Sequence, residues 1–87
     1  MSKLTFSDFE TQFLSIFSSD TQCKVIGSDT PKTLDLDSLD LVEVILEVED
    51  TFNIPDLLNK LKKDVFQYVD VPLCDLCSES FAVYQAI

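Results

Sequence analysis

The fold is decided by residues 34–56, which read LDLDSLDLVEVILEVEDTFNIPD. Asp37 is a suitable N-cap, and Asp40 three residues later repeats the capping pattern, so a helix is predicted to begin directly after Asp37. Pro55 disfavours helical backbone in the residue before it, and the helix is therefore predicted to end shortly before this proline. The stretch thus predicts one helix over residues 38–52.

This predicted helix has two apolar faces and a strongly acidic remainder. Residues 35–50 contain seven acids and no base. Two apolar stripes recur at helical spacing, and the second is displaced from the first. The first stripe consists of Val44, Ile45, Val48 and Phe52, and the second of Leu39, Val42 and Leu46.

Outward from this helix, apolar residues recur at helical spacing in three further segments. Ser7 and Glu10 have capping-box spacing at the start of the first of them. Signals for β-strands are weak, and Pro72 argues against a central strand near it. The further helices are predicted at residues 7–18, 56–69 and 75–87.

Residues 18–36 read as a long, irregular loop. They contain Gly27, Pro31 and many serine, threonine and aspartate residues, which favour turns. With 87 residues the chain is predicted to form one domain, residues 1–87. The fold class is therefore all-α: a small four-helix bundle with a long loop between its first two helices.

Composition restricts the classes of function. The net charge is −10, from 16 acids and six lysines, which argues against nucleic acid and anionic membrane surfaces as partners. It favours proteins that present basic patches. No apolar run approaches the roughly 20 residues of a membrane-spanning helix, so no membrane insertion is expected. An odd cysteine number without a signal peptide predicts a reducing, cytoplasmic compartment, or an organelle interior after removal of a targeting segment, and we expect a monomer.

Ser38 is the candidate functional residue. It opens an acidic helix after a long loop, where its side chain is expected to be exposed and the first backbone N–H groups are unpaired. A phosphodiester on this serine would be favoured by those groups and by the helix dipole, although the charge of Asp37 works against it. A serine beside an aspartate at a helix start is also ordinary capping, so the local pattern alone leaves both interpretations open.

The wider pattern resembles the phosphopantetheine attachment site of acyl carrier proteins. Asp-Ser-Leu-Asp, any residue, and Val-Glu occupy residues 37–43. The acidic run that closes on phenylalanine at residues 44–52 is similar to the second helix of this family, and residues 54–56 match its Ile-Pro-Asp. Residues 34–36 resemble its Leu-Gly-Leu lead-in. Helix order, length and charge extend a looser resemblance over the whole chain.

The resemblance implies a carrier and not an enzyme. A phosphopantetheinyl transferase, which uses Mg²⁺, would move 4′-phosphopantetheine from coenzyme A to Ser38. The thiol of this arm would hold acyl groups as thioesters and present them to acyl-processing synthases, reductases, dehydratases and transferases with basic docking patches. Asp37 points to the fatty-acid or polyketide branch. Eight residues match positions of the family's recognition helix, which docks on partners: Asp37, Leu39, Asp40, Val42, Glu43, Leu46, Glu49 and Asp50.

Family members also shelter the acyl chain between their helices. By this analogy the lining would consist of Val44, Ile45, Val48, Phe52, Leu61 and Val83, residues that are equally suited to an ordinary core.

The chain departs from the family pattern in three places. Asp35 stands where glycine is usual, so the backbone at the entry to the helix is expected to differ. Thr33 replaces a frequent aspartate. Residues 57–71 are longer than the usual third helix and carry three lysines, which would either pair with the acidic helix, the simpler option, or contact an acidic partner. Cys74 and Cys77 are interpreted as small apolar residues, because a zinc site needs more ligands and the chain has no histidine.

Other classes of function remain as alternatives. An enzyme would need a base for its nucleophile, and the chain has no histidine and no Ser-x-x-Lys or Gly-x-Ser-x-Gly arrangement. A divalent-ion sensor would need the spacing of a Ca²⁺ loop, which Asp35, Asp37 and Asp40 lack, so no metal is predicted. The main alternative is an unmodified interaction module that uses the helix over residues 38–52 as a docking surface.

Overall fold

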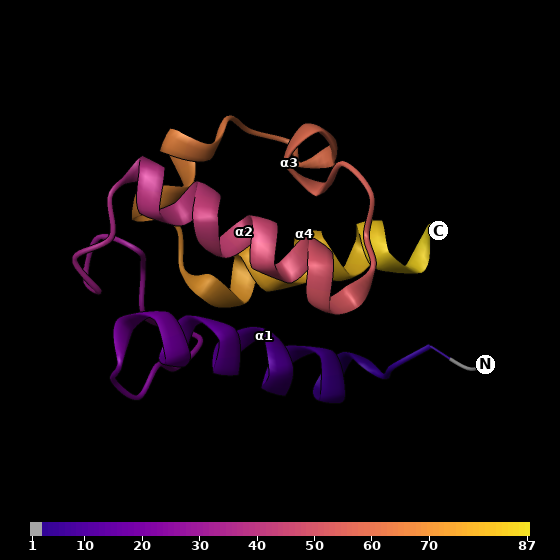
Figure 1. Cartoon of the computed structure of the whole chain (residues 1–87), viewed down its shortest axis with the longest axis horizontal. Coiled ribbons are helices and arrows are strands. Elements are labelled where there is room, and N and C mark those ends of the chain that lie inside the picture. The colour runs from indigo at the N-terminus through magenta and orange to yellow at the C-terminus, as the bar shows by residue number, and fades with distance from the viewer. Residues whose placement is uncertain (1–2) are drawn as a thin grey trace.

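The computed structural model describes residues 3–87 and is helical throughout its regular elements. Helices α1, α2 and α4 are long, α3 is a single turn, and a 3₁₀ helix, η1, precedes α4 (Figure 1). The predicted all-helical bundle with a long connection after its first helix is confirmed. The bounds are α1 Phe6–Thr21, α2 Ser38–Phe52, α3 Leu57–Lys60, η1 Val65–Asp70 and α4 Leu73–Gln85.

Helix α2 has the predicted bounds because its capping is local. The Asp37 carboxylate accepts a hydrogen bond from the Asp40 N–H at 2.8 Å, and the Asp40 carboxylate accepts one from the Asp37 N–H at 3.4 Å. At the other end Asn53 adopts the left-handed conformation with φ 56° and closes the helix. Both signals can be read from neighbouring residues alone.

Helix α1 starts and ends differently from the prediction. Its N-cap is Thr5 and not Ser7: the Thr5 hydroxyl accepts a hydrogen bond from the Asp8 N–H at 3.2 Å. The helix continues past Ser18 to Thr21 and stops at Gln22, which has φ 57°. The serines in its last turns do not stop the helix, since the buried stripe of Phe9, Phe13 and Phe17 anchors it to the core.

The predicted third helix over residues 56–69 is wrong. Helix α3 has only four residues, and the chain is extended at Leu61 and at Asp64 before η1 begins. Gln67 explains the break, because its side-chain oxygen accepts a hydrogen bond from the Asp64 N–H at 3.1 Å and starts a new turn. This side-chain cap competes with continuation of the helix.

Helix α4 begins at Leu73, two residues before the predicted start. The long loop caps it: the carbonyl oxygens of Asp29 and Gly27 accept hydrogen bonds from the N–H groups of Leu73 and Cys74 at 2.8 and 2.9 Å. Gly27 permits this approach, since a Cβ there would lie 3.1 Å from the Cβ of Cys74. These hydrogen bonds therefore hold the loop against the start of α4.

The other end of α4 is closed by the N-terminal segment. The Lys3 ammonium group donates to the carbonyl oxygens of Tyr84, Gln85 and Ile87 at 2.9, 3.0 and 2.6 Å. A cation at this position also complements the negative end of the helix dipole. Residues from the two ends of the chain thus lie side by side at one end of the molecule (Figure 1).

The core lies where α1 packs on α2 and α4, and where α2 also packs on α3 and η1. Four of the six residues considered as acyl-chain lining, Val44, Ile45, Val48 and Phe52, are buried in it, whereas Leu61 and Val83 are half-buried. Leu41, which the two-face analysis of α2 left out, is fully buried. Within residues 3–87 no helix is long and apolar enough to cross a membrane.

Candidate functional site

Ser38 is the first residue of α2 and lies at the edge of a surface hollow. The hollow has a volume of about 360 Å³ and is bounded by the end of the long loop, the start of α2 and the helix η1. In Figure 1, η1 lies beside the beginning of α2. The Ser38 side chain is half-buried. The residues that line the hollow are Lys32, Leu36, Asp37, Ser38, Phe66, Val69 and Asp70.

The loop before Ser38 is held by its own hydrogen bonds. The Thr30 N–H donates to the Thr33 hydroxyl at 2.9 Å, and the Thr33 N–H donates to the Thr30 hydroxyl at 3.1 Å. The Leu36 N–H donates to the Pro31 carbonyl oxygen at 2.8 Å. These contacts fix the direction in which the chain enters α2.

Asp35 has φ 61°, in the left-handed region that glycine adopts without steric cost. Aspartate tolerates this region better than most residues but still at some cost. The expectation that aspartate here would avoid the backbone conformation of a glycine is therefore wrong. The loop turns into α2 with a strained residue two positions before its N-cap.

We expect Asp35→Gly to stabilise the protein. Removing the Cβ relieves the positive φ, while the greater freedom of the unfolded chain offsets part of the gain, which leaves about 0.5 kcal/mol. Asp35→Val is the matched control, because a β-branched residue at φ 61° is expected to lose about 1–2 kcal/mol. Urea unfolding followed by circular dichroism measures both changes. A valine variant as stable as the glycine variant would show that the backbone at residue 35 is not strained.

The opposite wall of the hollow comes from η1. The Lys32 N–H donates to the Val69 carbonyl oxygen at 2.8 Å, so the loop and η1 are joined across the hollow. Phe66 is 60% exposed. The Lys32 ammonium lies 3.7 Å from the Asp70 carboxylate. Neither Lys32 nor Phe66 was predicted from the sequence to lie near Ser38, although Lys32 is the single base between residues 25 and 59.

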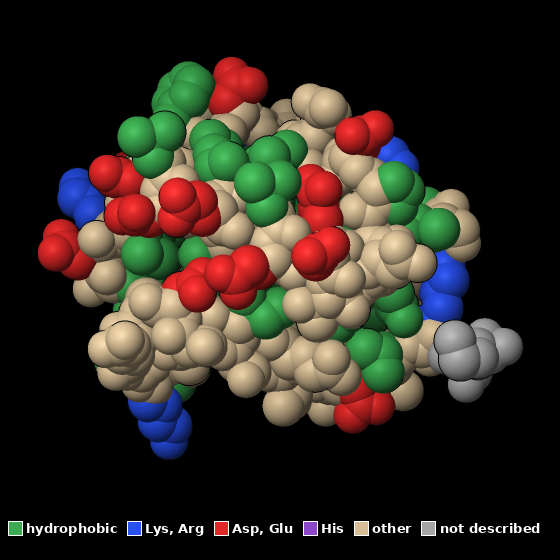
Figure 2. All heavy atoms as spheres, in the orientation of Figure 1, with side chains coloured by type: hydrophobic (Ala, Val, Ile, Leu, Met, Phe, Trp, Pro, Cys, Tyr) green, Lys and Arg blue, Asp and Glu red, His purple; other side chains and the backbone are tan. Residues whose placement is uncertain are grey.

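The eight residues predicted to dock partners lie along α2, and most of them face solvent. Leu39 is 74% and Leu46 is 48% exposed, whereas Val42 is half-buried. Figure 2 shows acidic side chains gathered around apolar ones on this face of the molecule. The exposed acids among the eight are Asp37, Asp40, Glu43 and Asp50.

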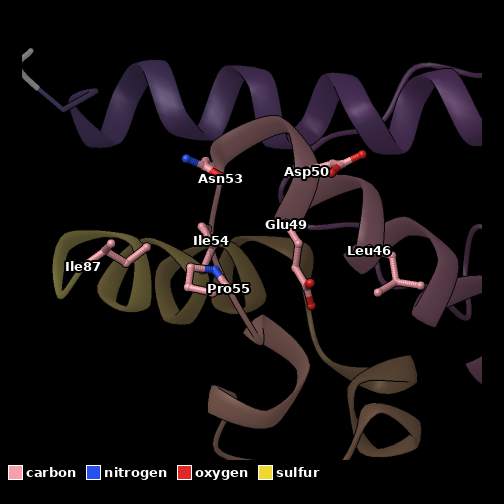
Figure 3. Close-up of a pocket in the computed structure, with 7 residues that line it drawn as sticks. All are labelled: Leu46, Glu49, Asp50, Asn53, Ile54, Pro55 and Ile87. Atoms are coloured by element: carbon pink, nitrogen blue, oxygen red, sulfur yellow. The ribbon is translucent and has the colours of Figure 1, made fainter.

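Glu49 differs from the other predicted docking acids because it also has a structural contact. It is half-buried, and its carboxylate accepts a hydrogen bond from the Leu58 N–H in the first turn of α3 at 3.4 Å. Figure 3 shows Glu49 directed toward α3 and away from Asp50. Both acids line a hollow of about 610 Å³ at the end of α2, together with Leu46, Asn53, Ile54, Pro55 and Ile87.

Four acidic residues border a small hollow of about 180 Å³ where the end of α1 approaches α2. They are Asp20, Asp40, Glu43 and Glu47. Desolvation raises the pKa of Glu47 above its ordinary value of 4.5, and the neighbouring carboxylates of Asp20 and Glu43 raise it further. Charged Glu47 is therefore less favourable in the folded protein than in the unfolded chain.

We expect Glu47→Gln to stabilise the protein at neutral pH by roughly 0.2–0.5 kcal/mol, the cost of like charges one helical turn apart. A raised folded pKa means that the charge penalty is complete above that pKa and disappears as pH falls through it toward 4.5. The gain of the variant should therefore vanish in mild acid, and it should also shrink in high salt. Urea unfolding midpoints of wild type and Glu47→Gln at pH 7 and in mild acid check this. A midpoint of the variant equal to or lower than that of the wild type at pH 7 would refute it.

The lysines of residues 57–71 do not pair with α2, so the simpler interpretation of this basic segment is wrong. The one ion pair found in residues 3–87 joins Lys32 to Asp70. Lys60 and Lys62 instead border a hollow of about 390 Å³ whose floor is formed by α4.

The cysteines form no cluster with other ligands. Cys23, Cys74 and Cys77 are free thiols. Burial raises the pKa of Cys77 to about 12, which keeps this thiol protonated and unreactive at neutral pH. Across residues 3–87, no three cysteine, aspartate or glutamate side chains gather as a metal site would require.

Comparison of the chain with known protein families, with curated proteins and with solved structures found no match. The functional assignment therefore rests on the residues around Ser38 and on their geometry.

Proposed function

We propose that this chain is an acyl carrier: Ser38 holds a 4′-phosphopantetheine arm, and the thiol at the end of the arm carries acyl intermediates as thioesters. The observation that carries the proposal is the coincidence of motif and geometry. The pattern Asp-Ser-Leu-Asp-x-Val-Glu occupies residues 37–43, and its serine is the first residue of a capped acidic helix beside an open hollow.

The chemistry at Ser38 needs no catalytic group from this chain. In the transfer step the Ser38 Oγ bonds to the phosphorus of the arm, and the adenosine bisphosphate half of coenzyme A leaves. The partner transferase would supply the base and Mg²⁺. The product carries a phosphodiester at the N-terminus of α2, where unpaired backbone N–H groups and the helix dipole favour an anion.

The exposed face of α2 supports the delivery half of this function. Leu39 and Leu46 are large apolar side chains that remain exposed among carboxylates. An apolar anchor within a charged rim is typical of a surface that binds proteins. Synthases and transferases of fatty-acid, polyketide or related lipid metabolism that present basic patches are the proposed partners. Three free thiols support a cytoplasmic location.

Intact-protein mass after incubation with coenzyme A, Mg²⁺ and a broad-specificity phosphopantetheinyl transferase tests the proposal. We expect the wild type to gain one phosphopantetheine and Ser38→Ala to gain none. Ser78→Ala is the matched control, since Ser78 is an exposed serine on α4 and its variant should be modified like the wild type. No gain on folded wild-type protein, or a gain that survives in Ser38→Ala, would overturn the assignment.

A second candidate is an interaction module without the arm, which the 74% exposure of Leu39 favours independently of Ser38. A comparison of Ser38→Ala with Leu39→Ala distinguishes the two functions. For a carrier, Ser38→Ala abolishes function in the pathway while Leu39→Ala weakens it. For an unmodified module, Leu39→Ala abolishes partner binding while Ser38→Ala changes little.

A further inference from the structure

The hollow beside Ser38 combines an apolar wall with one cation. Phe66 and Val69 of η1 supply the wall, and Phe66 leaves 60% of its surface exposed in doing so. Lys32 is the single base in the lining, against the two carboxylates of Asp37 and Asp70. The same hollow thus offers an exposed aromatic side chain and one lysine to a ligand that has both an apolar and an anionic part.

Lys32 is free to change partners. Its side chain and that of Asp70 are 76% and 69% exposed, and their charged atoms lie 3.7 Å apart. Pairs of this kind contribute about 0.2–1 kcal/mol and are easily exchanged. The Lys32 backbone, in contrast, is fixed by its hydrogen bond to the Val69 carbonyl oxygen at 2.8 Å. The backbone of Lys32 is therefore held at the rim of the hollow, whereas its ammonium group can move because the side chain is flexible.

Loading of Ser38 would change the electrostatics of this hollow. A phosphodiester adds one negative charge between Asp37 and the rest of an acidic helix start. Asp37 repels the phosphodiester on either side, because it also lines the hollow. Asp40 and Glu43 add repulsion along α2, whereas attraction to Lys32 favours positions toward η1. The apolar gem-dimethyl group of pantetheine is separated from the phosphate oxygen by one methylene group and would then contact the exposed ring of Phe66.

We propose that, once Ser38 is loaded, Lys32 exchanges Asp70 for the phosphodiester, and the arm lies in the hollow against Phe66 and Val69. This inference rests on the proposed carrier function. It makes Lys32 a positioning residue that determines on which side of α2 the arm lies. Exposed Leu39 is left free for partners, so that docking on α2 and storage of the arm on η1 use different surfaces.

Isotope-filtered nuclear Overhauser contacts between the unlabelled arm and the labelled protein provide the test. In loaded wild-type protein we expect contacts from the gem-dimethyl protons to the Phe66 ring and the Val69 methyl groups. Lys32→Met should weaken these contacts about threefold, because the loss of one exposed ion pair changes an equilibrium by about this factor. Lys60→Met, which removes a lysine from a different hollow, should leave them unchanged. Asp70→Asn should preserve or strengthen them, because it removes the competing carboxylate.

The outcomes distinguish this inference from the carrier function on which it rests. Intact mass reports whether Ser38 is loaded, and the contacts report where the arm lies. Loaded protein without contacts to Phe66 and Val69, or with contacts that Lys32→Met leaves unchanged, overturns the inference while the carrier function stands. Absence of loading overturns the carrier function itself. Salt of roughly 0.5 M should reduce the wild-type contacts toward those of Lys32→Met.

Discussion

Phe9→Ala is expected to cost about 3–5 kcal/mol in the free energy of unfolding, the range for truncation of a buried aromatic side chain. Phe9 is fully buried and joins all three long helices. Its ring centroid lies 4.2 Å from that of Phe52 on α2, and 5.2 Å from those of Phe81 and Tyr84 on α4. Truncation leaves a cavity between α1, α2 and α4.

A loss of this size approaches the total stability of the protein. A domain of this length has roughly 4–13 kcal/mol of unfolding free energy, and small domains tend to the lower end. Urea unfolding followed by circular dichroism should show Phe9→Ala unfolding at a much lower urea concentration, or partly unfolded without urea. Phe6→Ala is the control: Phe6 is 37% exposed and packs edge-on against Phe81, so its loss should cost less than about 1.5 kcal/mol.

The parts of the fold that local chemistry determines could be predicted from the sequence. The bounds of α2 follow from Asp37 and Asp40 at one end and from Asn53 and Pro55 at the other, and all four lie within three residues of the bound that they set. The buried stripes of α1 and α2 follow from helical spacing. Exposure of Leu39 and Leu46 agrees with their positions outside these stripes, whereas Ser38, which was expected to be exposed, is half-buried.

The third segment shows what local patterns miss. Apolar residues at helical spacing from Leu57 to Val69 fit one long helix, yet the chain breaks after Lys60. Spacing records which residues are apolar and not whether the backbone between them is continuous. The break coincides with the side-chain cap that Gln67 gives to the Asp64 N–H, and an apolar pattern does not record such a cap. The position of η1 after the break also depends on a distant partner, since the Tyr68 hydroxyl donates to the Glu79 carboxylate.

Only a part of the candidate site was predicted from the sequence. Ser38 and the acids of α2 were found because they belong to one continuous motif. Lys32 and Phe66 were not found, since their approach depends on the long loop packing against η1, and 33 residues separate them in sequence. The cap that Asp29 and Gly27 provide to α4 is of the same kind: it joins segments more than 40 residues apart.

Tyr68 holds this part of the fold together, and Tyr68→Phe is expected to cost about 1–3 kcal/mol. The side chain is fully buried. Its hydroxyl donates a hydrogen bond to the Glu79 carboxylate at 2.6 Å and accepts one from the Lys63 N–H at 3.1 Å. Phenylalanine fills the same space but leaves a part-buried carboxylate and a backbone N–H without this partner. Tyr84→Phe is the matched control, because within residues 3–87 the Tyr84 hydroxyl has one hydrogen bond, which it accepts from the Leu4 N–H at 3.0 Å.

The pH dependence of this variant distinguishes the hydrogen bonds from simple packing. Burial, followed by the hydrogen bond to Glu79, raises the pKa of Tyr68 from 10.0 to about 12. Because the folded pKa is the higher one, the contribution of the neutral phenol is complete below pH 10 and is lost as pH rises toward 12. The difference in urea midpoint between wild type and Tyr68→Phe should therefore be constant from pH 7 to pH 9 and shrink above pH 10. A difference that does not change with pH would contradict this account.

Tyr68→Phe should also affect the candidate site, although Tyr68 does not line the hollow beside Ser38. Phe66 and Val69, which form its wall, lie on either side of Tyr68 in η1. When the anchor is lost, η1 should open locally before the bundle unfolds, and amide hydrogen exchange of residues 65–70 should accelerate more than that of α1. In loaded protein the contacts of the arm with Phe66 should weaken at neutral pH, while transfer of the arm to Ser38 should continue. Unchanged exchange in η1 would show that its packing against α2, and not Tyr68, fixes the wall.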